Sequence, residues 1–228
     1  MKSKMNGVRI FILGVIITGI NFSVNTGISY GFRLGFNEGV SKGANTYFLE
    51  ALIGEQFRLD IFFNPLGYLL MLLGLAFIKG HGKYIKNARI FAVVGCIADI
   101  IKLVLPFAVS QYHILPPMLI CIAVELLSMT LILYFFTLAC KKQVDNYTYM
   151  EVGKDLIFAT ELYAIASVIS YVILPFAALY IYFARGAYVL VIILSYAAII
   201  YYSYKVLAYT KKLHLFGEGG NPGDKESF

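Results

Sequence analysis

The sequence has few charged residues, few cysteines and histidines, and no tryptophan. Charged residues make up 14% of the 228 positions, whereas a soluble domain carries about 25%. Hydrophobic residues make up 60%, so the composition excludes an ordinary soluble domain and indicates a multi-span membrane protein. The lipid bilayer is therefore the first partner that we expect.

Cysteine and histidine are too scattered for a disulfide framework or a zinc site. The three cysteines lie far apart in or beside apolar segments, without a CxxC pattern, at Cys96, Cys121 and Cys140. We interpret them as packing residues. The three histidines fall in predicted loops or tails, so no predicted span offers an axial haem ligand. The sequence therefore predicts no metal site and no cofactor.

Motifs of familiar enzyme and nucleotide-binding classes are also missing. The chain has no GxxxxGK[ST] or HExxH sequence and no arginine-rich voltage-sensor helix. Carboxylates are present, but without the nucleophile–base spacing of an active site, so we expect no enzyme. The formal charge of +6 comes from short Lys and Arg clusters beside apolar runs. That pattern is typical of span ends and not of a nucleic-acid-binding surface.

Six apolar segments are long enough to cross a bilayer, which requires about 20 mostly apolar helical residues. They cover residues 8–28, 61–78, 89–110, 114–140, 155–182 and 187–209. We therefore expect an all-α integral membrane protein with six transmembrane helices. Residues 29–60 are expected to form an outer loop, in which 44–57 resembles a short amphipathic surface helix. Residues 211–228 are expected to be a disordered tail.

Positive charges alternate between the two sides of the predicted spans. Lys and Arg cluster before the first span and after the second, fourth and sixth spans. Residues 111–117 contain no Lys or Arg, and residues 180–186 contain only Arg185. The positive-inside rule therefore predicts that both termini are cytoplasmic and that the chain lies in the cell membrane. In the absence of tryptophan, tyrosines at the ends of the last two spans are expected to anchor them at the interface.

Short sequence matches recur along the chain and indicate an internal repeat. The matches are VLPFA at 104–108 with ILPFA at 173–177, a lysine pair at 141–142 with one at 211–212, and RIF at 9–11 with RIF at 89–91. They favour three parallel repeats, each a helical hairpin of two consecutive spans. Chance resemblance between apolar sequences is the alternative.

Ionisable side chains at bilayer depth are informative because each costs about 2.5–3.5 kcal/mol on insertion scales. Counting 1.5 Å per helical residue from the flanking basic residues, Asp99 lies about 15 Å deep, Lys102 about 20 Å and Glu125 about 24 Å. Asp99 and Lys102 can meet on one helix face, and Glu125 is expected to reach Lys102 from the neighbouring helix. Glu161 and Lys205 share a depth of about 10 Å, which predicts an ion pair. Snorkelling of Lys205 towards the interface is the alternative.

Uncharged polar residues are predicted to lie at the same level as the deepest charges. Asn21 and Asn25 come out about 18 and 24 Å deep, and Asn64 about 22 Å. With Lys102 and Glu125 they are expected to form a polar layer in the outer half of the membrane. The long outer loop would lie directly above this layer.

Two interpretations of the polar layer remain open. In the first, the layer binds or transports a small polar solute, with Lys102 and Glu125 as contacts and Asp99 as a proton or cation site. In the second, its residues only join helices, through interactions worth about 0.6–2 kcal/mol each. The protein would then be a non-enzymatic accessory or scaffold subunit, partnered by another membrane protein or by copies of itself.

The segment NPLGYLLMLLGLAFI at 64–78, followed by a basic loop and KNARIFAVVG at 86–95, carries a family resemblance. It resembles a pattern of uncharacterised bacterial six-span membrane proteins. The resemblance covers residues 64–95 and implies a topology. It implies no activity, because that group has none that could be carried over.

Overall fold

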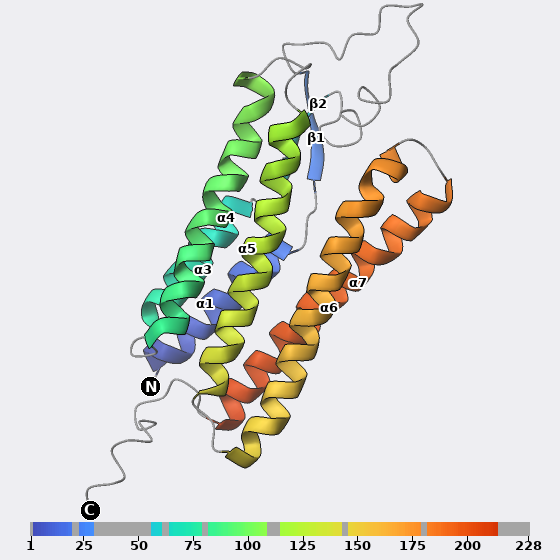
Figure 1. Ribbon diagram of the computed structural model, residues 1–228. Helices are drawn as coiled ribbons and strands as arrows, with labels where there is room; N and C mark the ends of the chain where they lie inside the picture. Colours follow the sequence, from blue (N-terminus) through green and yellow to red (C-terminus); the bar gives the residue numbers. More distant parts are fainter. Residues whose placement is uncertain are drawn as a thin grey trace, which may run out of the picture.

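A computed structural model describes residues 2–19, 23–29, 56–60, 64–78, 82–108, 115–142, 146–178 and 182–213. Within these ranges the chain forms six α-helices and two short β-strands (Figure 1). The helices are α1 (Lys2–Gly19), α3 (Asn64–Phe77), α4 (Gly82–Ala108), α5 (Leu115–Lys141), α6 (Asn146–Ala178) and α7 (Tyr182–Leu213). The strands are β1 (Ser23–Ser29) and β2 (Gln56–Asp60).

Three of the described helices contain segments long and apolar enough to cross a membrane. These segments are Pro116–Lys141, Gly153–Ile173 and Gly186–Lys211. Helices α1 and α3 contribute shorter apolar segments. Helix α4 is as long as α5, but Asp99 and Lys102 interrupt its apolar run. The structure therefore supports the expected helical membrane class, with three helices that meet the requirement for a span.

The first expected span, residues 8–28, is wrong over its last part. Helix α1 ends at Gly19, and residues 23–29 form β1, which pairs antiparallel with β2. Val24 lies opposite Leu59, and the register shifts between Asn25 and Ser29. Asn and Gly are poor helix formers, and the β-branched residues of SVNTGIS favour a strand. Strand β2 also includes the end of the amphipathic helix expected at 44–57, whereas most of that segment lies outside the described residues.

The later helices differ from the expected spans mainly at their ends. Helix α6 begins at Asn146 instead of residue 155, and α7 extends to Leu213 instead of residue 209. Helix α7 therefore includes the first residues of the expected tail, and residues 214–228 lie outside the described part of the chain. Hydrophobicity alone misses such polar extensions because a helix continues beyond the apolar core of the bilayer.

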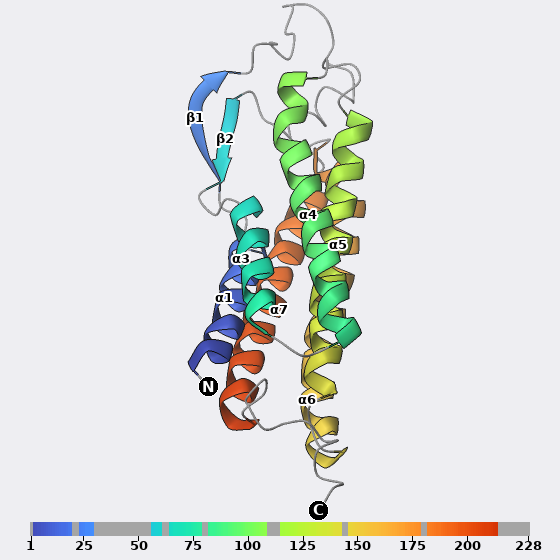
Figure 2. The same ribbon diagram turned by 90° about the vertical axis from the view of Figure 1, so that its left-hand side faces the viewer.

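The helices pack in chain order. The most extensive contacts join α1 with α3, α4 with α5, and α6 with α7. Further contacts join α3 with α4, α5 with α6, and α7 with α1, so the sequence of contacts closes on itself (Figures 1 and 2). The β1–β2 ribbon lies at one end of this bundle, and α1 begins and α7 ends near the other. We call these the ribbon end and the terminal end.

Glycines allow α1 and α3 to approach closely. Gly7 and Gly14 on α1 face Gly74 and Gly67 on α3, with a spacing of seven residues on each helix. A Cβ atom on Gly14 would lie 2.7 Å from the main-chain nitrogen of Met71, which is closer than real Cβ contacts allow. Small residues at helix interfaces are typical of membrane proteins because they let backbones pack together.

The core is densest in the terminal half of the bundle. Phe11 of α1 stacks on Phe136 of α5 with ring centroids 4.1 Å apart, and both side chains are fully buried. The Tyr202 hydroxyl of α7 lies 3.0 Å from the Leu133 carbonyl oxygen and 3.2 Å from the Thr137 hydroxyl. We call Phe11, Phe136 and Tyr202 the aromatic layer. It joins α1, α5 and α7 across the centre of the bundle.

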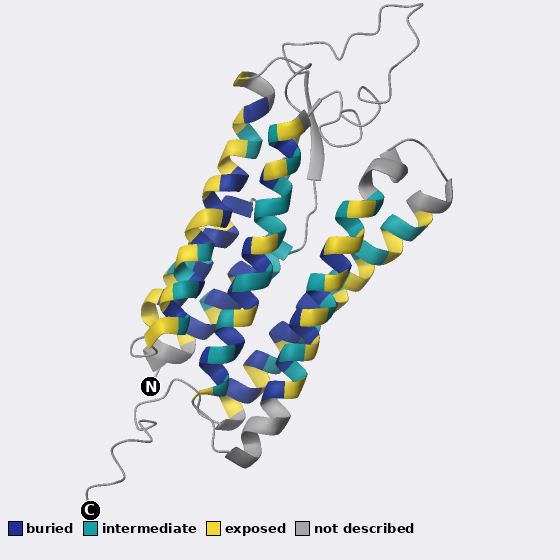
Figure 3. Ribbon diagram, in the orientation of Figure 1, coloured by how far each residue is buried: buried dark blue, intermediate teal, exposed yellow. Residues whose placement is uncertain are grey.

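Burial decreases towards the ribbon end. Seven residues of α7 are buried between Ala198 and Thr210, whereas none is buried between Gly186 and Ala197. Figure 3 shows the same difference, and Figure 1 shows the α6–α7 pair diverging from α4–α5 in that direction. Packing between the helix pairs is therefore concentrated in the terminal half.

Candidate functional site

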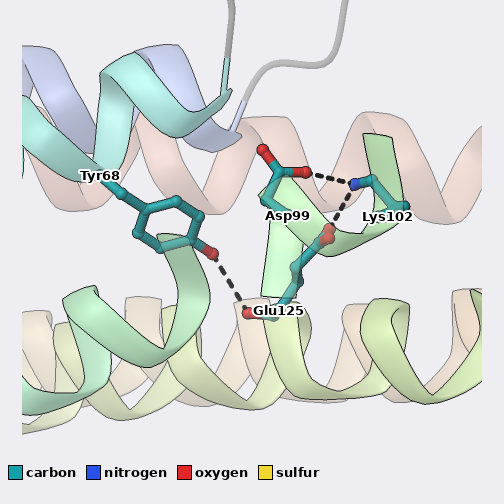
Figure 4. A network of polar contacts seen from close by, with 4 residues as sticks. All are labelled: Tyr68, Asp99, Lys102 and Glu125. Carbon is teal, nitrogen blue, oxygen red and sulfur yellow. Dashed lines mark hydrogen bonds and ion pairs between the residues drawn. The ribbon is translucent and has the colours of Figure 1, made fainter. Parts of the chain in front are cut away.

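Three charged side chains meet between α4 and α5. The Nζ atom of Lys102 lies 2.6 Å from Oδ1 of Asp99 and 2.6 Å from Oε2 of Glu125 (Figure 4). Asp99 is one helical turn before Lys102 on α4, and Glu125 projects from α5. We call these three residues the triad. A single ammonium group thus joins two carboxylates from neighbouring helices.

The triad lies largely inside the protein. The exposed fraction of the side chain is 2% for Asp99, 14% for Glu125 and 20% for Lys102. Oδ2 of Asp99 and Oε1 of Glu125 are buried and have no hydrogen-bond partner among the described residues. Because two carboxylates face one ammonium, the cluster carries one excess negative charge when all three groups are ionised. Buried polar atoms are normally satisfied, so these two oxygens make the triad a candidate binding site.

Tyr68 of α3 contacts both helices that carry the triad, α4 and α5. Its side chain is 1% exposed, and its hydroxyl donates to the main-chain carbonyl of Glu125 at 3.5 Å. Its ring lies against Gly95 of α4, where a Cβ atom would lie 2.8 Å from the Tyr68 hydroxyl oxygen. Gly95 is one turn before Asp99, so the glycine admits the tyrosine directly below the triad. Sequence reasoning missed both residues, although the spacing of Gly95 and Asp99 was available as a signal.

The expected polar layer is only partly assembled in the described structure. Asn64 is 4% exposed at the start of α3. The adjacent Pro65 carbonyl accepts a weak contact from the Cys96 thiol at 4.0 Å, which places the start of α3 near the level of the triad. Asn21 lies outside the described residues. Asn25 lies in β1, where its backbone is paired with Arg58, and its side chain is outside the described part.

A second ionic cluster lies between α6 and α7, and it corrects an expectation. Lys205 contacts Oδ2 of Asp155 at 2.6 Å, and does not pair with Glu161, which is exposed. The Tyr209 and Tyr201 hydroxyls donate to the same carboxylate, and both rings lie beside Lys205, with centroids 5.8 and 5.4 Å from Nζ. The depth count took Asp155 as the boundary of the span, but α6 begins nine residues earlier, so Asp155 is the residue that faces Lys205.

A GxSxG pattern, typical of the nucleophile elbow of serine hydrolases, occurs as GISYG at residues 27–31. Ser29 is the last residue of β1, which belongs to a two-stranded antiparallel sheet. The elbow instead follows a strand of a large α/β sheet. All three histidines lie outside the described residues, so nothing in the described part of the chain supports an active site at Ser29.

The described part of the chain offers no cluster of metal-binding side chains. Within the described ranges, no group of three or more His, Cys, Asp or Glu side chains is placed to hold a metal ion. The triad contributes only two carboxylates and includes an ammonium group, which would repel a metal ion. We take the triad as the candidate functional site. Its groups can bind a partner through charge-assisted hydrogen bonds.

No protein-family model, curated protein or solved structure matches the chain. The resemblance of residues 64–95 to six-span membrane proteins therefore stays a prediction. Because function resides in sites and not in folds, the residues of the triad carry the functional argument.

Proposed function

We propose that this membrane protein binds and transports a small polar solute, and that the triad is its binding site. The observation that carries the proposal is the imbalance of the triad: two carboxylates share one ammonium, and two buried carboxylate oxygens have no hydrogen-bond partner among the described residues. In a cluster that only joined helices, we would expect equal numbers of positive and negative charges and a hydrogen-bond partner for every buried oxygen. Hydroxyl or amino groups of a solute would satisfy these oxygens.

We also infer that all six helices cross the membrane, with both termini in the cytoplasm. Arg9, Lys86, Lys154 and Lys211 are exposed and belong to the terminal halves of their helices, and the exposed Lys142 directly follows the end of α5. The positive-inside rule expects such residues on a cytoplasmic side. Helices α1 and α3 are about 27 and 21 Å long at 1.5 Å per residue, less than the hydrocarbon thickness of about 30 Å. The β ribbon continues this pair towards the outer surface.

The three most extensive helix pairs support the repeat interpretation. Each pair, α1–α3, α4–α5 and α6–α7, is a hairpin that starts and finishes at the terminal end. Three hairpins of the same direction would follow from a parallel threefold repeat. The triad would then belong to the middle hairpin, with Tyr68 contributed by the first.

Two features favour entry of the solute from the ribbon end. The aromatic layer lies on the terminal side of the triad, and Phe136 follows Glu125 by eleven residues, or about 16 Å along α5. Its three side chains are fully buried, which favours a barrier on this side. Towards the ribbon end, α7 has no buried residue between Gly186 and Ala197. The solute therefore enters from the outer side of the membrane.

The proposal is tested by screening the purified protein in lipid nanodiscs with four probes of different chemistry: glycine, ethanolamine, acetate and glucose. We expect at least one probe to raise the melting temperature of the wild type and to enter liposomes that contain it. Lys102→Met and Glu125→Gln should remove both effects. Glu161→Gln, which changes an exposed carboxylate outside the triad, should keep them. Unchanged binding in both triad variants would overturn the proposal.

A further inference from the structure

We propose that the triad holds one exchangeable proton, shared between the carboxyl groups of Asp99 and Glu125, which makes the site electrically neutral. This inference rests on the proposed function, because it assigns the charge state of the same site. Water supplies the proton: a hydronium ion transfers it to a carboxylate oxygen, a carboxylic acid forms and water is released. No electrons move in this step.

The geometry brings the two carboxyl groups together. Both contact the same Nζ atom at 2.6 Å, so their bonded oxygens are separated by no more than twice that distance. Two carboxylates that share a site resist ionising together, and one proton shared by the pair relieves their repulsion. Lys102 compensates one of the two negative charges and leaves the other.

Burial raises the free-energy cost of the remaining negative charge. The Asp99 side chain is 2% exposed and that of Glu125 is 14% exposed, so water solvates neither carboxylate fully. A carboxylate without a compensating cation at such a site is neutralised by taking up a proton. Protonation also turns one carboxyl into a donor, which can satisfy an oxygen that has no partner among the described residues.

Among the described residues, the titratable groups that act on the triad include no cation that supplies the missing charge. These groups are Tyr68 from α3, Cys96 from α4, Cys121 from α5 and Tyr163 from α6. Phenols and thiols are neutral when protonated and negative when ionised, so none of them can be positive. The guanidinium of Arg89, on the terminal side along α4, donates to the Leu75 carbonyl instead.

A proton fits the site better than an alkali or divalent cation. Hard metal cations bind several oxygen ligands, and Ca²⁺ binds six or more. The triad offers two open carboxylate oxygens beside an ammonium group. Within the described ranges, no third acidic, histidine or cysteine side chain completes a ligand set. A proton needs only one oxygen to hold it and a second to accept its hydrogen bond.

The test measures thermal stability against pH for the wild type, Glu125→Gln, Asp99→Asn and Glu161→Gln in nanodiscs. Each of the first two substitutions leaves one carboxylate with one ammonium, so neither variant needs the proton. Because the folded wild type binds the proton, its stability relative to these variants should rise as the pH falls. The size of the effect should correspond to uptake of about one proton. Glu161→Gln should follow the wild type.

An infrared spectrum provides a readout that does not depend on unfolding. The carbonyl-stretch band of a protonated carboxylic acid should be present in the wild type at neutral pH and absent from both triad variants. Two variants are included so that a failure of one to fold leaves the comparison intact. Absence of the band in the wild type would overturn the inference, as would a stability difference that does not change with pH.

Addition of sodium tests whether a metal cation, and not a proton, supplies the missing positive charge. If NaCl added at constant pH, with choline chloride as the control, stabilises the wild type but not Glu125→Gln, the missing charge is a metal cation and the proton assignment fails. The outcome is separable from the proposed function. Probe binding without a pH dependence would overturn only the proton, whereas a one-proton dependence without binding of any of the four probes would overturn only the solute site.

Discussion

Lys102 of α4 and Glu125 of α5 form an ion pair of 2.6 Å between neighbouring helices, although 22 residues separate them in the chain. Because Asp99 contacts the same ammonium nitrogen, the Lys102 side chain holds the two carboxylates together. Removing the ammonium would leave the two carboxyl groups facing each other inside the protein without their cation. The energetic consequences of single and paired substitutions should therefore differ.

Lys102→Met should destabilise the protein strongly. Breaking a buried ion pair by removing one partner costs about 3 kcal/mol or more, because the other charge remains buried. Glu125→Gln should cost less, since Asp99 and Lys102 remain as a neutral pair. Unfolding of the purified variants in nanodiscs measures both effects. Equal stability of Lys102→Met and the wild type would show that Lys102 does not hold the carboxylates together.

Gly74→Val should disrupt the packing of α1 on α3. A Cβ atom at Gly74 would lie 2.7 Å from the Cα atom of Phe11, and the obstacle is backbone that cannot move aside. Overpacking of this kind costs about 1–3 kcal/mol. Gly186→Val is the matched control, because no heavy atom lies within 4 Å of its added Cβ. A comparable loss of melting temperature in both variants would contradict the close approach of α1 and α3.

Phe136→Ala should open the aromatic layer. The Phe136 ring is fully buried and stacks on Phe11, so its removal leaves a cavity and costs about 3 kcal/mol. Phe158→Ala removes the same ring from an exposed position on α6, where the side chain is 58% exposed. Melting temperatures of the two variants should therefore fall by clearly different amounts. If Phe158→Ala proves equally damaging, the layer is not the centre of the packed half.

Asp155 and Lys205 should be energetically coupled, whereas Glu161 and Lys205 should not. The Asp155 carboxylate contacts Lys205 and accepts hydrogen bonds from Tyr209 and Tyr201, so substituting either partner of the ion pair should alter the effect of substituting the other. A double-mutant cycle with Asp155→Asn and Lys205→Met measures this coupling. The cycle with Glu161→Gln and Lys205→Met should give additive effects. The reverse result would restore the pairing expected from depth.

Sequence reasoning succeeded where a single physical cause decides the structure. Long apolar runs placed α5, α6 and α7, since a bilayer demands about 20 apolar residues in a helix. The contacts of Asp99 and Glu125 with Lys102 follow from helical spacing and from equal depth on adjacent helices.

The remaining features depend on tertiary packing or on competing local preferences. Residues 20–28 combine apolar residues with small polar ones and continue the apolar run of α1, so hydrophobicity alone does not separate the end of α1 from β1. The partner of Lys205 depends on where α6 begins and how it is rotated, and an error in the first residue of the span changed the pairing from Asp155 to Glu161. The glycine contacts could have been suspected from the seven-residue spacing in α1 and α3.

Probe binding by the triple variant Asp99→Asn, Lys102→Met and Glu125→Gln tests the central claim most directly. This variant removes all three charges of the triad together, and replacing a buried ionic cluster by neutral groups is often tolerated without loss of stability. The solute-site account predicts a folded triple variant whose melting temperature no longer responds to glycine, ethanolamine, acetate or glucose, whereas the wild type responds to at least one of them. A folded triple variant that responds as the wild type does would contradict the account and leave the triad a connection between helices.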